Sequence, residues 1–170
     1  MLIGIGGVSR AGKSTLAKLL AAEFIKMDKA VAIIHQDEHV VAESELQLIR
    51  DKRDWEHPGS IDWPCLNQVI QERLKDHDIV ILEGLFAFNN QSINMLFTHK
   101  LFVVISKRTF LKRKQVDVRW GGTPEPAWYM EHICDSYLLY GRPKLDQSFL
   151  CINGARRFDI ISIVETFQQK

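Results

Sequence analysis

Apolar residues in this chain form short runs that alternate with longer amphipathic stretches. The runs occupy residues 2–6, 30–35, 79–82, 101–105 and 149–152. Strands that are apolar throughout are typical of a parallel sheet buried on both faces, because a half-exposed strand would alternate apolar and polar residues. The pattern therefore predicts an α/β fold with a five-stranded parallel sheet and helices on both faces.

The stretches between the runs predict helices, because their apolar residues recur every three or four positions. In residues 14–28, for example, Leu16, Leu20 and Phe24 fall on or near one face. Helices are expected over 14–28, 63–75, 92–98, 107–119, 127–140 and 160–167. A further short, polar helix is expected over 43–53. Residues 54–61 contain Pro58-Gly59 and are predicted to form a loop.

The polar residues of interest follow the ends of these strands. In an open parallel sheet, ligands bind beyond the carboxyl ends of the strands. A glycine-rich segment follows the first strand, Asp37 follows the second, Glu83 ends the third and a basic helix follows the fourth. The sequence therefore places its candidate chemistry on one rim of the sheet.

The glycine-rich segment reads Gly7-Val8-Ser9-Arg10-Ala11-Gly12-Lys13-Ser14 and matches G-x-x-x-x-G-K-[ST], the phosphate-binding loop, or P-loop. Gly7 and Gly12 allow backbone N–H groups to curl around a phosphate chain. Lys13 would place a charge on the β- and γ-phosphates, and Ser14 would offer its hydroxyl to Mg²⁺. The dinucleotide pattern G-x-G-x-x-G beginning at Gly4 fails, because Ser9 occupies its last position.

Two carboxylates on the same rim have a functional and a simpler interpretation. Asp37 is placed to accept or orient a substrate hydroxyl proton, or to hold Mg²⁺ through water; otherwise it caps a helix or lies in a solvated turn. Glu83 ends an apolar strand, where a carboxylate can support Mg²⁺; otherwise it is only a solvated strand end. The P-loop beside them favours the functional interpretation of both.

The helix expected over 107–119 is strongly basic. It is either a solvated surface face or a lid, about residues 107–126, that closes over phosphates and neutralises charge. Lys112, Arg113 and Lys114 are consecutive, so they cannot share one face of a helix. At most one or two of them should reach the site.

Composition limits the possible functions. The 170 residues are 46% hydrophobic and 25% charged, which supports one domain over residues 1–170. A net charge of +1 gives no reason to expect a nucleic-acid partner. No apolar run approaches membrane-spanning length, and the chain opens on the first strand, so we expect a cytoplasmic protein without a membrane partner. Cys65, Cys134 and Cys151 lack metal-binding spacing and are interpreted as reduced residues in or near the core.

These residues resemble those of the nicotinamide riboside kinases, within the wider uridine kinase-like group of P-loop kinases. The similarity covers most of the chain. Its anchors are residues 7–15, Gln36-Asp37, residues 81–89, the basic helix, Tyr137-Leu138 and Asn153-Gly154. The P-loop is generic, whereas Gln36-Asp37 and the E-G-x-x-x-F-N segment from Glu83 to Asn89 are more specific.

The resemblance implies a role for each matching residue. Asp37 would be the catalytic base at the 5′-hydroxyl of the acceptor, and Glu83 would help Ser14 hold Mg²⁺. Trp55 would stack on the base-like ring of the substrate, and Glu56 would hold its ribose hydroxyls. ATP would be bound by Gly7, Val8, Ser9, Arg10, Ala11, Gly12, Lys13, Ser14, Thr15 and Arg113. Lys13 and Arg113 would also act in catalysis, and Lys114 would contact the substrate.

The chain departs from the family at several positions. Glu38-His39-Val40 follows Asp37, where the family often has a second Asp and aromatic residues. Lys114 replaces a lid arginine and lacks its bidentate fork. Asp117 stands where a third lid arginine would fall, so Arg119 would have to compensate. Trp120 is the nearest candidate for a second aromatic around the ring.

The expected activity is therefore ATP- and Mg²⁺-dependent phosphorylation of the 5′-hydroxyl of a small nucleoside, with nicotinamide riboside as first choice. Uridine or cytidine is the alternative acceptor. A P-loop ATPase or switch without a small-molecule acceptor is the alternative class. No N-K-x-D guanine motif occurs, which argues against a GTPase. The sequence leaves the oligomeric state open.

Overall fold

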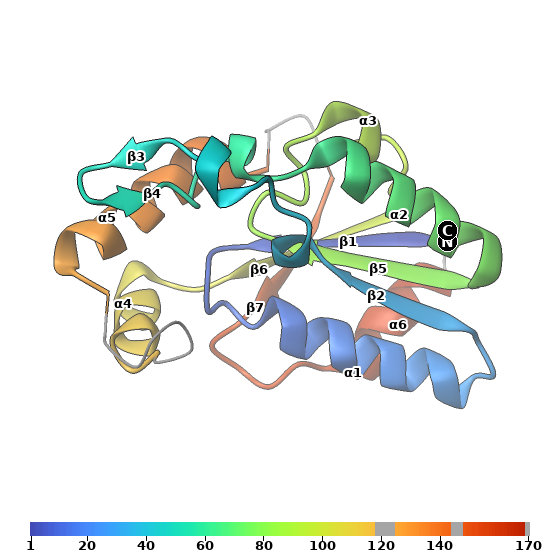
Figure 1. The fold of residues 1–170 in the computed structure, drawn as a ribbon. Helices are drawn as coiled ribbons and strands as arrows, with labels where there is room; N and C mark the ends of the chain where they lie inside the picture. Colours follow the sequence, from blue (N-terminus) through green and yellow to red (C-terminus); the bar gives the residue numbers. More distant parts are fainter. Residues whose placement is uncertain (118–124, 144–147, 169–170) are drawn as a thin grey trace.

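The computed structural model describes residues 1–117, 125–143 and 148–168. Its main sheet has five parallel strands in the order β2-β5-β1-β6-β7 (Figure 1). The strands are β1 (Leu2–Gly7), β2 (Val31–His35), β5 (Ile79–Gly84), β6 (His99–Val104) and β7 (Leu150–Asn153). The predicted five-stranded parallel α/β fold is confirmed.

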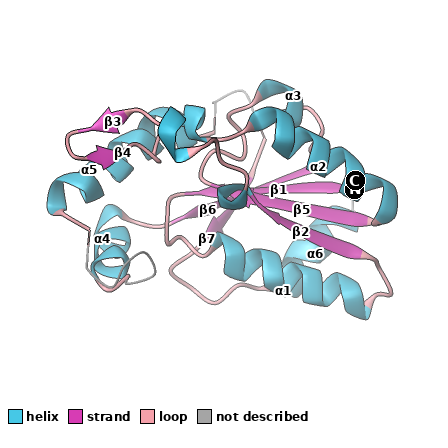
Figure 2. Cartoon of the chain, viewed as in Figure 1, coloured by secondary structure: helices cyan, strands magenta, loops and turns pink. Residues whose placement is uncertain are grey.

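Helices cover both faces of this sheet (Figure 2). They are α1 (Lys13–Lys26), α2 (Trp63–Asp76), α3 (Gln91–Asn94), α4 (Lys107–Gln115), α5 (Ala127–Ser136) and α6 (Ile160–Gln168). Asp62 caps the amino end of α2, because its side chain accepts a hydrogen bond from the backbone N–H of Cys65.

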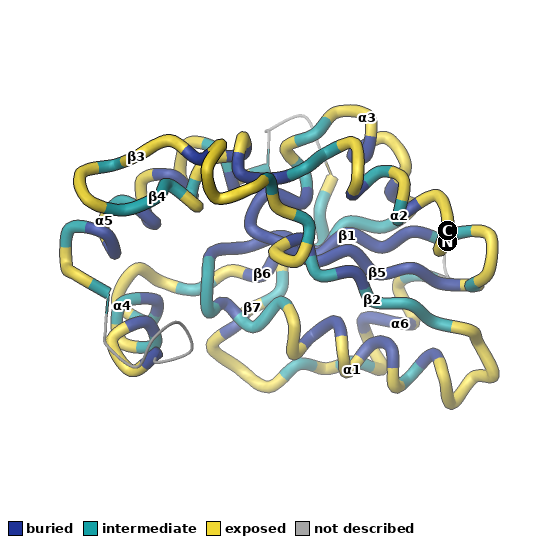
Figure 3. The backbone as a smooth tube through the Cα atoms, in the orientation of Figure 1, coloured by how far each residue is buried: buried dark blue, intermediate teal, exposed yellow. Residues whose placement is uncertain are grey.

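Successive strand residues point to opposite faces, so the sheet has two cores. Ile3 and Ile81 pack on one face with α1 and α6, whereas Leu2 and Leu82 pack on the other with α2 and α3. The central strands β1 and β5 are buried along their whole length (Figure 3). Polar residues at the carboxyl end of this rigid sheet are therefore held in fixed positions.

The prediction of a helix over 43–53 was wrong. The segment contains a short 3₁₀ turn, Glu43–Glu45, and an antiparallel hairpin of β3 (Leu48–Ile49) and β4 (Lys52–Arg53). The two-residue connection puts Arg50 at φ 55°, a left-handed conformation. It lacks the Asn-Gly or Asp-Gly signature of such turns, so the sequence carried no hairpin signal.

Other boundaries also differ from prediction. The helix expected over 92–98 ends at Asn94, and α5 ends at Ser136, where a π-helical turn, Tyr137–Gly141, continues it. The basic helix α4 ends at Gln115, and the expected lid residues Arg119 and Trp120 lie outside the described residues. Cys134 is buried, but Cys65 and Cys151 are exposed, which corrects their assignment to the core. In the described ranges, no helix is long and apolar enough to cross a membrane.

Candidate active site

The P-loop connects β1 to α1 and has the curled backbone that the motif predicts. Gly7 has φ 145° and Gly12 has φ 107°, conformations that residues with side chains rarely adopt. A Cβ atom on Gly7 would also lie 2.4 Å from the carbonyl oxygen of Val103 in β6. Gly12 caps the amino end of α1, so the loop and the positive end of the helix dipole face the same space.

Ser14 and Glu83 meet at the carboxyl ends of the strands. Ser14 lies in the first turn of α1, and its Oγ donates a 2.7 Å hydrogen bond to Oε1 of Glu83. His35, the last residue of β2, places Nδ1 2.7 Å from the same oxygen. Glu83 is buried, with 6% of its surface exposed. A hydroxyl and a carboxylate in contact supply the oxygen ligands that Mg²⁺ prefers.

A cavity of about 720 Å³ opens beside the P-loop. It is large enough for a nucleoside, since small-molecule sites commonly measure some 300–1,000 Å³. Six of the predicted site residues line it: Ser9, Lys13, Asp37, Trp55, Glu56 and Lys114. The structure thus gathers residues from four distant segments of the chain around one space.

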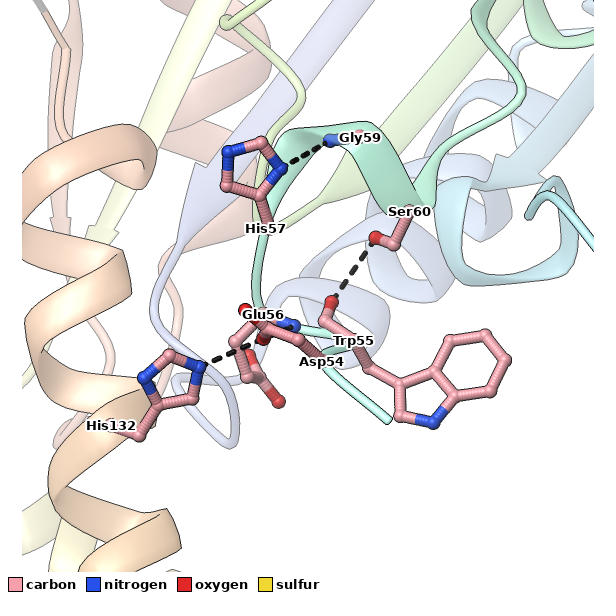
Figure 4. A network of polar contacts seen from close by, with 7 residues as sticks. All are labelled: Asp54, Trp55, Glu56, His57, Gly59, Ser60 and His132. Carbon is pink, nitrogen blue, oxygen red and sulfur yellow. Dashed lines mark hydrogen bonds and ion pairs between the residues drawn. The ribbon is translucent and has the colours of Figure 1, made fainter. Parts of the chain in front are cut away.

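One wall of the cavity is the loop that follows the β3–β4 hairpin. Nε2 of His132, in α5, lies 2.8 Å from Oδ1 of Asp54, and the same oxygen accepts a hydrogen bond from the backbone N–H of Glu56 (Figure 4). The hydroxyl of Ser60 donates to the carbonyl oxygen of Trp55. Figure 4 shows the Trp55 indole pointing away from His132. The backbone is held while the indole, 40% exposed, lines the cavity instead of packing fully into the core.

The carboxyl group of Glu56 has an unusual proton affinity. Burial raises its pKa from 4.5 to about 7, and the negative charges of Asp37 and Asp54 act in the same direction. The positive charge of Lys114 partly opposes this effect. A raised carboxyl pKa in a cavity is a common property of binding and catalytic sites.

Several known proteins are similar to this chain. No family model matches the chain. It is 26% identical over 140 residues to a uridine kinase of Ureaplasma parvum, covering 67% of each chain. It is 25% identical over 174 residues to a uridine kinase of Lactobacillus johnsonii, covering 86% of this chain and 79% of the other.

The structure of a possible uridine kinase from Bacillus stearothermophilus superimposes with a TM-score of 0.60 and 19% identity, covering 90% of this chain and 88% of that one. The two sequence relatives are uridine kinases, and the solved structure shares the fold of this chain. The chain is similar to uridine kinase-like P-loop kinases.

The basic helix α4 presents its residues to different partners. Lys114 is buried, lines the cavity and lies 3.9 Å from Oδ2 of Asp117. The other oxygen of Asp117 lies 3.7 Å from Nη1 of Arg10 in the P-loop. Asp117 is therefore buried with its two carboxylate oxygens facing two cationic side chains.

Arg113, in contrast, does not line the cavity. Its guanidinium donates to the backbone carbonyl oxygens of Arg10 at 3.0 Å, Ala11 at 3.4 Å and Gly154 at 2.9 Å. The expectation that only one or two of the three consecutive bases would reach the site fits this arrangement. The role of Arg113 toward ATP stays a prediction.

Sequence reasoning missed several residues of this kinase-family site. The β3–β4 hairpin contributes Leu48, Lys52 and Arg53 to the cavity wall, and α5 contributes Tyr129. Lys52 lies 2.6 Å from Glu125 and 5.0 Å from the centre of the Tyr129 ring. These contacts fasten the hairpin to α5 and to the residue Glu125 that precedes it, and they join segments more than seventy residues apart. Only the polar character of residues 43–53 marked the hairpin as unsuited to the core.

Proposed function

We propose that this protein transfers the γ-phosphoryl group of ATP, with Mg²⁺, to the primary 5′-hydroxyl of a small nucleoside. One observation carries the proposal: the cavity that begins at Ser9 and Lys13 of the P-loop also contains Asp37, Trp55 and Glu56. An ATPase or switch needs the P-loop residues Ser9 and Lys13 to bind a nucleotide. It does not need a cavity beside the P-loop that could hold a second small molecule.

The P-loop and α1 would hold the triphosphate through backbone N–H groups, the helix dipole and the ammonium group of Lys13. Ser14 and Glu83 would hold Mg²⁺, since their oxygens already touch. The metal, when bound, neutralises charge on the phosphate oxygens. In the described ranges no three His, Cys, Asp or Glu side chains could hold a metal by themselves. This agrees with a magnesium ion that also relies on phosphate and water.

Asp37 would act as the base. The acceptor oxygen forms a bond to the γ-phosphorus while the bond from that phosphorus to the β–γ bridging oxygen breaks, which releases ADP. The hydroxyl proton passes to the Asp37 carboxylate. Asp37 is exposed on the short turn after β2 and lines the cavity, so a bound acceptor can reach it.

Nicotinamide riboside is the acceptor that we place first. Its pyridinium ring is positively charged and gains from an indole face both by stacking and by attraction to the ring quadrupole. Trp55 offers such a face, and Glu56 beside it can accept hydrogen bonds from ribose hydroxyls. Uridine or cytidine is the second candidate, favoured by the uridine kinases among the relatives.

ADP release measured with and without nucleosides tests the proposal. We expect little turnover with ATP and Mg²⁺ alone, and rapid turnover once nicotinamide riboside, uridine or cytidine is supplied. Lys13→Ala should abolish turnover and keep the melting temperature, because the shape of the loop depends on its glycines. Rapid hydrolysis with no acceptor, unchanged by every nucleoside in the panel, would instead establish an ATPase.

A further inference from the structure

A histidine outside the cavity contacts the residue that we assign to the metal. His35 ends β2 and pairs in register with Glu83 of β5. Because residues paired in register on parallel strands point to the same face, the two side chains lie together on the face covered by α1. Their separation is 2.7 Å from Nδ1 to Oε1.

The direction of this hydrogen bond follows from the chemistry of its partners. An ionised carboxylate only accepts hydrogen bonds, so His35 must carry a hydrogen on Nδ1. The hydroxyl of Ser14 donates to the same oxygen, also at 2.7 Å. Oε1 thus accepts from two donors, which fix the carboxylate from both sides. Among the described residues, none donates a hydrogen bond to the other oxygen of Glu83, Oε2. Oε2 is therefore available to a metal ion or to water bound to that ion.

The imidazole is itself held in place. His35 is only partly exposed, with 30% of its side-chain surface open to solvent. The next residue, Gln36, is 1% exposed, and its Oε1 accepts a hydrogen bond from the backbone N–H of Phe86, just beyond β5. This contact ties the end of β2 to the segment after Glu83. His35 is not among the residues that line the cavity, so it would act from behind Glu83 and not on the proposed acceptor.

We propose that His35 is a positioning residue of the metal site: its Nδ1–H holds Glu83 so that Glu83 orients the Ser14 hydroxyl for Mg²⁺. This inference rests on the proposed Mg·ATP function. Groups that orient metal ligands from behind typically change metal affinity by about 10- to 100-fold when removed. His35 would therefore affect the metal, and it would leave metal-free nucleotide binding unchanged.

The test compares three substitutions at position 35. His35→Asn retains an amide N–H close to the place of Nδ1, whereas His35→Leu and His35→Ala remove the donor. Mn²⁺ binding is measured by electron paramagnetic resonance in the presence of a non-hydrolysable ATP analogue. Affinity for the analogue in EDTA and the melting temperature report on the nucleotide site and the fold.

We expect His35→Leu and His35→Ala to weaken Mn²⁺ binding by about 10- to 100-fold and His35→Asn to bind it nearly as the wild type does. Analogue affinity in EDTA should be the same in all proteins. The proposal is overturned if the donor-free variants bind Mn²⁺ normally, or if His35→Asn is as impaired as they are. Absence of analogue-dependent Mn²⁺ binding in the wild type would instead refute the proposed Mg·ATP function itself.

Discussion

Arg113 in α4 donates a 2.9 Å hydrogen bond from Nη2 to the carbonyl oxygen of Gly154, just beyond β7. Through Nη1 the same guanidinium binds the carbonyl oxygens of Arg10 and Ala11 in the P-loop. One side chain therefore ties α4, the P-loop and the end of the sheet together. The planar fork presents Nη1 to two of these oxygens and Nη2 to the third, whereas a lysine would have to reach all three from a single nitrogen.

Arg113→Lys should therefore destabilise the protein while keeping its charge. We expect the free energy of unfolding to fall by about 1.5–3 kcal/mol, the scale for a hydrogen bond to a charged group. Urea denaturation measures this, with the exposed neighbour Lys112→Ala as control, which should change stability by less than about 0.5 kcal/mol. Unchanged stability with a large loss of phosphoryl transfer would favour the role toward ATP that the sequence predicted.

Asp37→Asn should separate chemistry from binding. The substitution preserves size but removes the basic carboxylate, so we expect kcat to fall on the order of 10²-fold or more. The affinity for ATP, measured by calorimetry, should change little. Glu38→Gln, on the same exposed turn, serves as the matched control and should change neither kcat nor the affinity for ATP appreciably. Loss of ATP binding with normal turnover at saturation would make Asp37 a nucleotide or metal residue.

Trp55→Ala should distinguish the candidate acceptors. The pyridinium ring of nicotinamide riboside loses an attraction to the indole that neutral uridine never had, worth ~0.5–2 kcal/mol, or roughly 2- to 30-fold in affinity. KM should therefore rise more for nicotinamide riboside than for uridine. Trp63→Phe is the control, because the Trp63 indole N–H bonds the carbonyl oxygen of Pro58 and does not line the cavity. Equal rises for both nucleosides would remove the support for a cationic acceptor.

Glu56→Gln should alter the pH dependence of stability. Burial raises the pKa of Glu56 to about 7 in the folded protein, above its ordinary 4.5, so the folded state binds this proton more tightly than the unfolded state does. The contribution of Glu56 to stability is therefore fully present below pH 4.5 and is lost as the pH rises through about 7. Glutamine stays neutral throughout.

Urea denaturation at pH 5 and pH 8 tests this sign. The variant should gain stability relative to the wild type between the two pH values, because only the wild type must then bury a charge. Asp37, Asp54, His132 and Lys114 also face Glu56, but they are present in both proteins, so the difference between them isolates Glu56. A difference that does not change with pH would show that Glu56 is already ionised at pH 5.

The sequence by itself determined the five parallel strands, most of the helices and the P-loop. Apolar runs specified the five strands, and recurring apolar positions specified helices such as α1 and α2, because these patterns are local and reflect burial directly. Because Lys13 and Asp37 both follow the carboxyl ends of predicted parallel strands, the sequence also predicted that they lie on the same edge of the sheet. The structure places both in one cavity.

Tertiary contacts decided the remaining features. The β3–β4 hairpin lacks turn residues and is held instead by distant partners. These are Glu125, just before α5, and Trp128 in α5, whose ring centre lies 4.5 Å from the Arg50 guanidinium. In the sequence, Arg113 cannot be distinguished from its basic neighbours Lys112 and Lys114. In the structure, its guanidinium donates hydrogen bonds to backbone carbonyl oxygens 41 and more residues away. In the sequence, His35 is only the last residue of a strand; the strand register places it beside Glu83. Each depends on a pairing between residues far apart in the chain, which no periodicity within a short window can encode.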